Sequence, residues 1–557
     1  MKATLTRRSF LAGAGVAGAT LASAALAGCA GGAPKAAEEG QGADAAPASD
    51  AAPAPIADAD IDETRDAEVC IVGAGVSGVV AALACAEEGL QVAVMQKKSA
   101  ISTQGTGASC IGSRRQKELG LETGSFEDLM RLKAAEEGGL VNYDLFKLWY
   151  DRSGEALDWV CDRASENGVD AVFDQIANWE EADDWVKTTQ ISSMFSGEGG
   201  VGASALIEAL YPLTLDAGVQ YVFDTTAQQL VRGDDGRVIA VIGQKKDGGY
   251  VRINASKAVV ICSGGYENNP EMRQKYLPHA MRFDNISDND GEGIQMGLWA
   301  GAAIDPAPHA SNIHYNVSET DAYGSAIPWL RVGVEGTRLG NEDIAYGFLP
   351  FLDLKSKEAC CFQVFDSDFD AYYEKMLVNG CGIFRSFPPA EAVGAATQLE
   401  TSEDTSAWSP LKKIYESCVE QGTAVKADTL EELAQKAGID AAGLQATVKR
   451  YNELYDSGAD SDYGKKFSRM HAVRTPPFYA IRRQAYVLGT LGGLVINENM
   501  QVMDTEGEVI PGLFAAGNAS GGRFFGTPAQ GMAVPASTIS RALTWGYLAG
   551  KYIAENE

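Results

Sequence analysis

Histidine is scarce in this sequence, and paired metal-binding cysteines are absent. Only four histidines occur among the 557 residues, and no two of them are adjacent on a helical face, so a multi-histidine metal site is not expected. Ten cysteines are present, but none forms the C-x-x-C pattern of zinc, redox or haem-attachment sites. The sequence therefore predicts no metal centre and no covalently attached haem.

Basic residues are also in short supply. Lysine and arginine number 46 against 75 aspartates and glutamates, which gives a net charge of −29. Contacts to phosphates depend on basic side chains, so nonspecific nucleic-acid binding is not expected. Hydrophobic residues make up 45% and charged residues 22% of the chain, an ordinary globular composition. A chain of this length is expected to fold as roughly two to four lobes.

A long apolar run is missing as well. The longest candidate, residues 11–27, contains several glycines and is short for a membrane span. Arg7 and Arg8 precede it in T-R-R-S-F-L, which resembles a twin-arginine export signal. The run ends in L-A-G-C at Cys29, which resembles a lipoprotein cleavage box. A processed signal is therefore favoured over a transmembrane anchor.

The N-terminal sequence accordingly predicts a targeting segment rather than a folded domain. We expect residues 1–28 to be a twin-arginine lipoprotein signal peptide. Residues 29–65 are rich in alanine, glycine, proline and acids and are expected to be a flexible tether. Lipid on Cys29 would hold the protein outside the cytoplasmic membrane.

Two adjacent cysteines, Cys360 and Cys361, leave two interpretations open. They form either an unusual disulfide or two separate, partly buried thiols. The second arrangement is the more common one, because a free cysteine behaves as a small hydrophobic residue.

The first pattern that carries chemistry is a glycine turn between a strand and a helix. An apolar strand pattern over 69–72 is followed by Gly73, Gly75 and Gly78, spaced as G-x-G-x-x-G, and then by an alanine-rich helical pattern. A second strand pattern closes a unit of about 30 residues. In such a unit the three glycines make the turn, admit a pyrophosphate and pack the helix on the strand. The helix N-terminus favours phosphate, so the unit predicts dinucleotide binding.

The end of the second strand departs from the usual pattern. An acid normally stands there and holds the ribose hydroxyls, but this sequence has Gln96. Glutamine also hydrogen-bonds hydroxyl groups, so we expect the site to work with altered contacts.

Two later segments repeat the form of an apolar strand ending in glycines, at 257–265 and 508–522. Together with the glycine motif they resemble the FAD-dependent fumarate reductase and succinate dehydrogenase flavoproteins. The soluble branch of that family includes flavocytochrome fumarate reductases, urocanate reductases and 3-ketosteroid Δ1-dehydrogenases. The resemblance covers roughly residues 66–557, and its further motifs follow in the expected order: 102–107, 289–293, 336–342, 488–493 and 515–518.

This resemblance implies an α/β protein with a split Rossmann-like FAD-binding domain and an inserted α+β capping domain. The implied FAD-binding parts are 66–300 and 481–557, with the capping, substrate-binding domain at 301–480. Substrate would lie between the flavin ring and the cap. The implied FAD contacts are Gly73, Gly75, Val76, Ser77, Gly78, Gln96, Lys97, Ser102, Thr103, Gly107, Ala108, Ala227, Gly264, Gly265, Asp290, Gly517, Asn518, Ala533 and Val534.

Several cations that hold fumarate in its reductases have no counterpart here. Gly489 replaces the histidine before T-x-G-G, and Asp370 stands in the place of the acid arginine. The arginine of R-x-G-G-N is also absent from residues 526–533. Two carboxylates would be poorly neutralised without these cations, which argues against fumarate as the substrate.

Other residues resemble the ketosteroid dehydrogenase branch. The segment 488–493 reads L-G-T-L-G-G, and Pro528 to Gly531 forms P-x-x-G, in which the Gly531 N–H is expected to bind the substrate ketone. Tyr346 stands where that branch places a tyrosine and is our first candidate for proton donor or acceptor, with a packed tyrosine as the alternative. Thr527 departs from the branch, which has a tyrosine there.

Further candidates carry more than one interpretation. Arg523 either binds a carboxylate or phenolate, or acts as an acid, or lies at the surface or near the flavin phosphates. Glu342 either relays protons or forms a structural ion pair. Arg541 is expected to serve the flavin or helix packing. His309, Asn312 and His314 lie where the family keeps a substrate histidine, although ordinary loop positions are favoured.

We therefore expect an exported FAD-dependent oxidoreductase. It would reduce the C=C bond of an α,β-unsaturated carbonyl compound by hydride transfer from flavin N5 and protonation, in anaerobic electron transfer. A 3-ketosteroid dehydrogenase working in the oxidising direction is the first alternative, and a non-catalytic, ligand-binding flavolipoprotein is another. With no haem motif or second flavin domain apparent in the sequence, a separate quinol-linked or haem-bearing electron partner is expected.

Overall fold

The computed structural model describes residues 52–121, 123–173, 192–197, 200–315, 324–344, 346–376, 404–526 and 536–557. Its largest sheet has eight strands. Six of them follow the order β17-β18-β10-β1-β2-β7; of the other two, β9 pairs with β10, and β8 pairs with β9. Strand β1 pairs in parallel with both β2 and β10, and β10 pairs in parallel with β18. The strands are β1 (Ile61–Val72), β2 (Val92–Met95), β7 (Gln220–Val222), β8 (Thr225–Arg232), β9 (Val238–Lys245), β10 (Tyr250–Ile261), β17 (Gln501–Met503) and β18 (Val509–Ala515).

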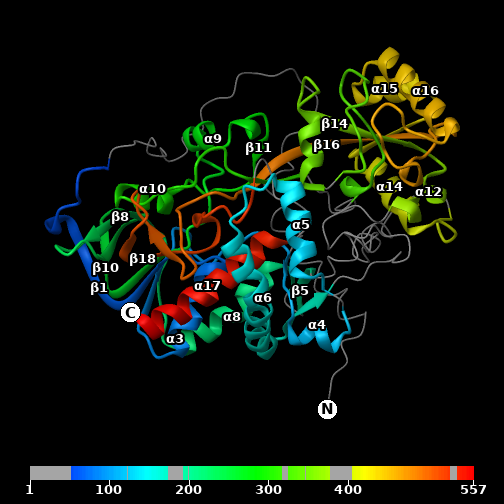
Figure 1. Cartoon of the computed structure of the whole chain (residues 1–557). Helices are drawn as coiled ribbons and strands as arrows, with labels where there is room; N and C mark the ends of the chain where they lie inside the picture. Colours follow the sequence, from blue (N-terminus) through cyan, green and yellow to red (C-terminus); the bar gives the residue numbers. More distant parts are fainter. Residues whose placement is uncertain are drawn as a thin grey trace.

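Two helices from opposite ends of the chain pack together on this sheet (Figure 1). Helix α3 (Val76–Glu87) follows β1, and α17 (Ser537–Asn556) ends the chain. Glycines permit the close approach: a Cβ at Gly546 would lie 2.5 Å from the Ser77 carbonyl oxygen, and one at Gly550 would lie 2.6 Å from the Ala84 Cβ. The C-terminal segment is therefore part of the same layer as the N-terminal glycine motif.

Further helices and a small sheet extend this lobe. The helices are α4 (Arg114–Glu118), α5 (Phe126–Glu137), α6 (Tyr143–Ala164), α8 (Ala203–Asp216), α9 (Pro270–Tyr276) and α10 (Glu292–Trp299). The small sheet contains β3 (Gly107–Ser109), β4 (Val169–Phe173), β5 (Ser192–Gly197) and β6 (Gly200–Val201).

A six-stranded sheet links this lobe to a second one. Its long strand β16 (Phe478–Thr490) pairs with β14 (Cys360–Asp366) through residues 478–484 and with β12 (Ser311–Tyr315) through residues 485–490. In Figure 1 the long strand runs from the larger lobe into the smaller one. The other strands of this sheet are β11 (Asp284–Asn285), β13 (Leu330–Val332) and β15 (Ala424–Ala427).

The smaller lobe has its own apolar interior. Two buried clusters, drawn from residues between 327 and 481, fill it. Its helices are α11 (Leu349–Asp353), α12 (Phe369–Met376), α14 (Pro410–Glu420), α15 (Leu430–Ala437) and α16 (Ala441–Ser457). Strand β16 itself passes through residue 480, where the sequence predicts the cap to end, so the two lobes share one continuous backbone segment.

Two expectations concern cysteines and the membrane. Every cysteine in the described part of the chain is free and buried, so Cys360 and Cys361 are two separate thiols.

Within the described ranges, no helix combines the length and the apolar character that a membrane crossing requires.

Candidate cofactor cleft and active site

A cleft with an empty volume of about 1250 Å³, including solvent at its mouth, opens where β1 and β2 end. This edge of a parallel sheet is where open α/β folds bind their ligands. The cleft contains many of the predicted FAD contacts: Gly73, Gly75, Val76, Ser77, Gln96, Lys97, Ser102, Thr103, Ala227, Gly264, Gly517 and Asn518. Segments separated by more than 400 residues in the sequence thus meet at one elongated site.

Glycine plays a different structural role at each of the three positions of the motif. Gly73 adopts a left-handed conformation, with φ +102, and a Cβ there would lie 2.6 Å from the Cys262 carbonyl oxygen. A Cβ at Gly78 would lie 1.9 Å from the Gly73 carbonyl oxygen. Gly75 is the N-cap of α3 with an ordinary φ of −87, and a Cβ there would meet nothing closer than Ser102, at 3.6 Å. Gly73 and Gly78 are therefore required by the fold, whereas Gly75 leaves room for a ligand.

Replacing Gly75 with alanine is expected to weaken FAD binding about 10- to 100-fold while leaving the apoprotein as stable as before. The added methyl group has space in the protein itself but occupies the place where a pyrophosphate approaches the helix N-terminus, and overpacking of this kind costs about 1–3 kcal/mol. FAD titration of the apoprotein measures the affinity, and thermal unfolding measures the stability.

A matched control is Gly233→Ala, where φ is also ordinary. The nearest atom to a Cβ there is an Asp235 carboxylate oxygen, at 3.0 Å, and two Ile239 side-chain carbons follow at 3.6 and 3.7 Å. This position is not among the residues that line the cleft, so FAD affinity should not change. Equal affinities for the wild type and Gly75→Ala would contradict the placement of the pyrophosphate.

One end of the cleft is polar and charged. Gln96 is buried and donates from Nε2 to the Ala100 carbonyl oxygen at 3.2 Å. The Lys97 ammonium group lies 3.2 Å from Asp290 and 3.1 Å from Glu292. Burial acts to lower the pKa of Lys97, but the two carboxylates outweigh it, so the pKa lies above its usual value. Because Gln96 directly follows β2, this is the end that suits an adenosine ribose.

The residues that line the opposite end, here called the ring end, are uncharged, and this end suits the flavin ring. Asn312 of β12 lies directly opposite Gly489 of β16 in the register, and both line the cleft beside Leu488. A Cβ at Gly489 would lie 3.2 Å from the Asn518 amide nitrogen and 3.7 Å from the Asn312 Cβ. The absence of a side chain at Gly489 therefore keeps this end of the cleft open.

Tyr346 lies one side chain beyond Asn312. Asn312 and His314 stand on the same face of β12, because alternate residues of a strand share a face. The Tyr346 ring packs edge-on against His314, with centroids 5.2 Å apart, and its hydroxyl lies 3.3 Å from the Ser325 hydroxyl. It also accepts a hydrogen bond from the Tyr315 N–H at 3.4 Å. Tyr346 is thus a buried polar residue next to the ring end rather than a residue of the cleft wall.

His314 is expected to be uncharged there. Burial lowers the pKa of His314 to about 4, well below its usual value of about 6.5. By contrast, His309 is held by Tyr266 at 2.7 Å and by the Asp305 carbonyl oxygen at 2.8 Å, and it does not line the cleft. His309 is therefore a satisfied interior histidine.

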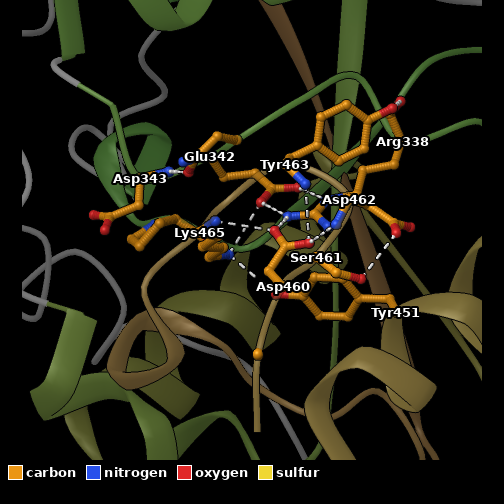
Figure 2. Close-up of polar contacts among 12 residues, drawn as sticks. Arg338, Glu342, Asp343, Tyr451, Asp460, Ser461, Asp462, Tyr463 and Lys465 are labelled. Carbon is orange, nitrogen blue, oxygen red and sulfur yellow. Dashed lines mark hydrogen bonds and ion pairs between the residues drawn. The ribbon is translucent and has the colours of Figure 1, made fainter. Parts of the chain in front are cut away.

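Glu342 lies in a buried ionic cluster of the smaller lobe (Figure 2). Arg338 donates two hydrogen bonds to the Glu342 carboxylate, at 2.9 and 2.8 Å, and one to Asp460 at 2.8 Å. Lys465 lies 3.2 Å from Glu342 and donates to the Tyr451 hydroxyl at 3.0 Å. The structural ion pair considered for Glu342 is therefore present, and Glu342 does not line the cleft.

Arg523 also lies away from the cleft wall. Its backbone is in the left-handed region, with φ +55, and its N–H donates to the Asp305 carboxylate at 3.4 Å. Arg523 is half-buried, and its guanidinium group donates to the Pro306 carbonyl oxygen at 3.3 Å in a solvent-exposed hydrogen bond. Of the alternatives for Arg523, this geometry favours the surface position.

Some predicted cofactor contacts lie behind the cleft wall instead of on it. Gly107 and Gly265 permit close packing: a Cβ would lie 1.7 Å from the Ser193 carbonyl oxygen or 2.1 Å from the Thr490 hydroxyl, respectively. The other members of this group are Gly78, Ala108 and Asp290. Gly531, Ala533, Val534 and Thr527 lie outside the described residues, as do Cys29 and the predicted signal peptide.

The sequence missed part of the cleft wall. The additional residues include Thr225 and Thr226 at the start of β8, and Thr538, Ile539 and Ala542 at the start of α17. Asn289, Gly293 and Leu488 also line the cleft; they belong to the predicted motifs 289–293 and 488–493 but were not named as individual FAD contacts. Helix α17 follows the predicted P-x-x-G turn, and a helix N-terminus is itself favourable for anionic groups. The start of a helix directly after this turn was the feature of the sequence that could have predicted Thr538, Ile539 and Ala542 as cleft residues.

The donor set fits FAD. A backbone turn with no side chain and a helix N-terminus stand at the centre of the cleft, with polar residues at one end and an uncharged surface at the other. The two ends match a nucleotide and a flavin ring joined by a pyrophosphate.

Known proteins give independent evidence on this site. A family model described as "FAD binding domain" matches residues 68–316 and 348–531. The chain is 25% identical to vinyl phenol reductase of Lactiplantibacillus plantarum, over 88% of this chain and 96% of the relative. It is 30% identical to 3-oxosteroid 1-dehydrogenase of Mycobacterium tuberculosis, over 54% of each chain. The open conformation of a flavocytochrome c3 fumarate reductase superposes with a TM-score of 0.65 at 22% identity, covering 89% of this chain and 79% of that one.

Proposed function

Since the chain belongs to the FAD binding domain family, we propose that it is a reductase of the C=C bond in an uncharged α,β-unsaturated carbonyl compound. FAD is its cofactor, and it is an oxidoreductase that acts on C=C or CH–CH bonds. The predicted α/β fold and the predicted fumarate reductase-like family are both confirmed.

The extent of the alignments supports reduction over dehydrogenation. Vinyl phenol reductase aligns with 88% of this chain, whereas the 3-oxosteroid dehydrogenase aligns with 54%. The reductase thus matches parts of the chain that the dehydrogenase alignment does not reach. A ketosteroid dehydrogenase remains the second candidate, because Pro528 to Gly531 spells the P-x-x-G turn of that branch.

The charge of the ring end carries the proposal on substrate class. Among the described cleft residues, the charged ones are Lys97, Lys98, Asp288 and Glu292, all around the ribose end. Asn312, Gly489 and Asn518 at the ring end are uncharged. A dicarboxylate there would lack the charge-assisted hydrogen bonds that offset its desolvation. A neutral conjugated ketone, ester or lactone suits these residues better.

The reaction requires a hydride, a polarised carbonyl group and a proton. Bound FAD supplies the hydride. The side-chain amides of Asn312 and Asn518 are available to orient the substrate and hydrogen-bond its carbonyl oxygen. Tyr346 is proposed as the source of the proton. Its hydroxyl group is held by the Ser325 hydroxyl at 3.3 Å and by the Tyr315 N–H at 3.4 Å. Because Tyr346 lies behind the ring end and not on the cleft wall, the proton would reach the substrate through the neighbouring His314 side chain or a water molecule. The Gly531 N–H is proposed as a further donor to the carbonyl oxygen.

Residues 1–28 are proposed to export the protein by the twin-arginine route, with lipid on Cys29 as the membrane anchor. Electrons would then reach the flavin from a separate quinol-linked or haem-bearing partner, in anaerobic electron transfer. The support is the R-R motif and the L-A-G-C box in the sequence.

A reoxidation screen tests the proposal. The bound flavin is reduced anaerobically, and its absorbance near 450 nm is followed after addition of enones, cinnamates, vinyl phenols, urocanate, fumarate or ketosteroids. We expect a neutral enone to reoxidise the flavin at least about tenfold faster than fumarate. Faster turnover of fumarate would contradict the assignment from the uncharged ring end. A purified protein without flavin absorbance would contradict both the reductase and the dehydrogenase interpretation.

A further inference from the structure

Arg541 is a fully buried cation without a carboxylate partner. Its exposed fraction is 0%, and among the described residues its side chain hydrogen-bonds the Asn518 amide and forms no ion pair with a carboxylate. Its Nη2 donates to the Asn518 Oδ1 at 3.0 Å, whereas Nε and Nη1 are buried without a hydrogen-bond partner among the described residues. Burial lowers the pKa of Arg541 to about 10, which still leaves it charged at neutral pH. Such a group is costly and calls for a reason.

The nearby groups do not neutralise this charge. The guanidinium lies over the Phe525 ring at 4.8 Å and near the Phe524 ring at 5.9 Å. Asp305 is the acid that acts on its pKa, but the Asp305 carboxylate accepts from the backbone N–H groups of Gly522 and Arg523. The positive charge at Arg541 is therefore left largely uncompensated inside the protein.

Arg541 fixes the orientation of the Asn518 amide. A guanidinium group can only donate hydrogen bonds, so the Asn518 oxygen must face it. The amide nitrogen of Asn518 then points the other way, and it lies 3.2 Å from the position that a Gly489 Cβ would take. Gly489, Leu488 and Asn312 line the ring end of the cleft together with Asn518. The result is an N–H donor presented to the cleft with a buried positive charge behind it.

We propose that Arg541 is a positioning residue that acts through Asn518 to make the bound flavin easier to reduce. Reduction places negative charge on the flavin, and a fixed donor backed by a cation stabilises that charge in a site of low dielectric. The inference depends on FAD binding in this cleft but not on which substrate is reduced. It explains why the buried face of α17 carries a cation with two nitrogens that have no hydrogen-bond partner among the described residues.

The test compares reduction potentials of the FAD-loaded protein in the absence of substrate. Arg541→Gln removes the charge but keeps a donor for Asn518, and Arg541→Lys keeps the charge. We expect Arg541→Gln to shift the equilibrium toward oxidised flavin at least about tenfold, or about 30 mV for a two-electron couple. Arg541→Lys should restore most of that shift. An unchanged potential in Arg541→Gln would overturn the proposal.

Asn518→Asp gives a second test if Arg541→Gln fails to hold FAD. The substitution is nearly isosteric, and it replaces the donor by a carboxylate that pairs with Arg541. We expect a shift of the same sign and of at least about tenfold. A potential equal to that of the wild type would also overturn the proposal. Arg273→Gln is the control, because Arg273 is buried, donates to the Ala280 and Phe283 carbonyl oxygens and does not line the cleft.

These measurements are independent of the substrate assignment. A protein that fails to reduce any enone but shows the expected potential shifts would contradict the proposed function and support the role of Arg541. The opposite result would reject the role of Arg541 and leave the proposed function intact.

Discussion

Replacing Tyr346 with phenylalanine is expected to lower turnover by about 10²- to 10⁴-fold, the usual contribution of a positioned general acid. FAD should stay bound, because Tyr346 does not line the cleft. The hydroxyl group lies beside the ring end, and its neighbours His314 and Ser325, among the described residues, are neutral. Neither neighbour can replace a lost proton donor, so the effect should fall mainly on kcat. Steady-state kinetics with the substrate found by reoxidation measures it.

Tyr315→Phe is the matched control for this substitution. Tyr315 is buried beside Tyr346, with ring centroids 6.2 Å apart, but its hydroxyl donates to Asp353 at 3.2 Å. Loss of that hydroxyl removes a buried hydrogen bond without touching the proposed proton donor, so kcat should change much less. If Tyr346→Phe and Tyr315→Phe slow turnover equally, Tyr346 is a packing residue and the proton comes from elsewhere.

Local sequence patterns predicted the nucleotide half of the site well. The turn at Gly73, the close contact at Gly78 and the open position at Gly75 depend only on a strand, a turn and a helix that follow one another. The same holds for Gly264, with φ +82, and Gly517, with φ +69. Such units carry their geometry in a short stretch of chain, so spacing alone identifies them.

The ring end depends on tertiary contacts that no short pattern contains. Asn312 reaches the cleft because β12 pairs with the far half of β16, and Ile539 reaches it because α17 packs on α3. The candidate roles of Glu342 and Arg523 rested on aligned motifs, which give neighbours in sequence but not direction. Their side chains meet Arg338 and Pro306 instead of the cleft.

Replacing Glu342 with glutamine is expected to lower the thermal unfolding temperature of the smaller lobe by about 6–20 °C. Glu342 and Lys465 are both fully buried, at 0% side-chain exposure, and Arg338 is 7% exposed. Removing one partner from a buried pair costs about 3–5 kcal/mol, because the remaining charge stays desolvated; each kcal/mol lowers the unfolding temperature of a lobe of this size by about 2–4 °C. Calorimetry of the FAD-loaded protein measures the shift.

The neighbouring pair Arg450 and Asp462 provides the control for Glu342→Gln. Arg450 is 51% exposed and Asp462 is 32% exposed, at a distance of 2.7 Å, and a pair of this kind contributes about 0–1 kcal/mol. Asp462→Asn should therefore change the unfolding temperature by no more than about 4 °C. An equal effect of the two substitutions would show that the buried cluster is not a special source of stability.

The pH dependence of stability gives the sign of the Glu342 interaction. Burial acts to raise the pKa of Glu342, but Lys465 and Arg338 outweigh it, so the pKa lies below the ordinary value of 4.5. A depressed carboxyl pKa contributes stability that is present above the unfolded pKa and is lost as the pH falls through the folded one. The wild type should therefore lose more stability than Glu342→Gln on acidification below about pH 4.5.

Kinetics of the same variant separates the two roles considered for Glu342. If Glu342 relayed protons, kcat of Glu342→Gln would be far lower than that of the wild type even at temperatures well below the unfolding temperature, where the variant is still folded. The cluster in Figure 2 instead indicates that Glu342 ties the segment 336–344 to the 460–465 turn. On this account kcat at low temperature stays within a few-fold of the wild type, and activity is lost on heating together with the fold.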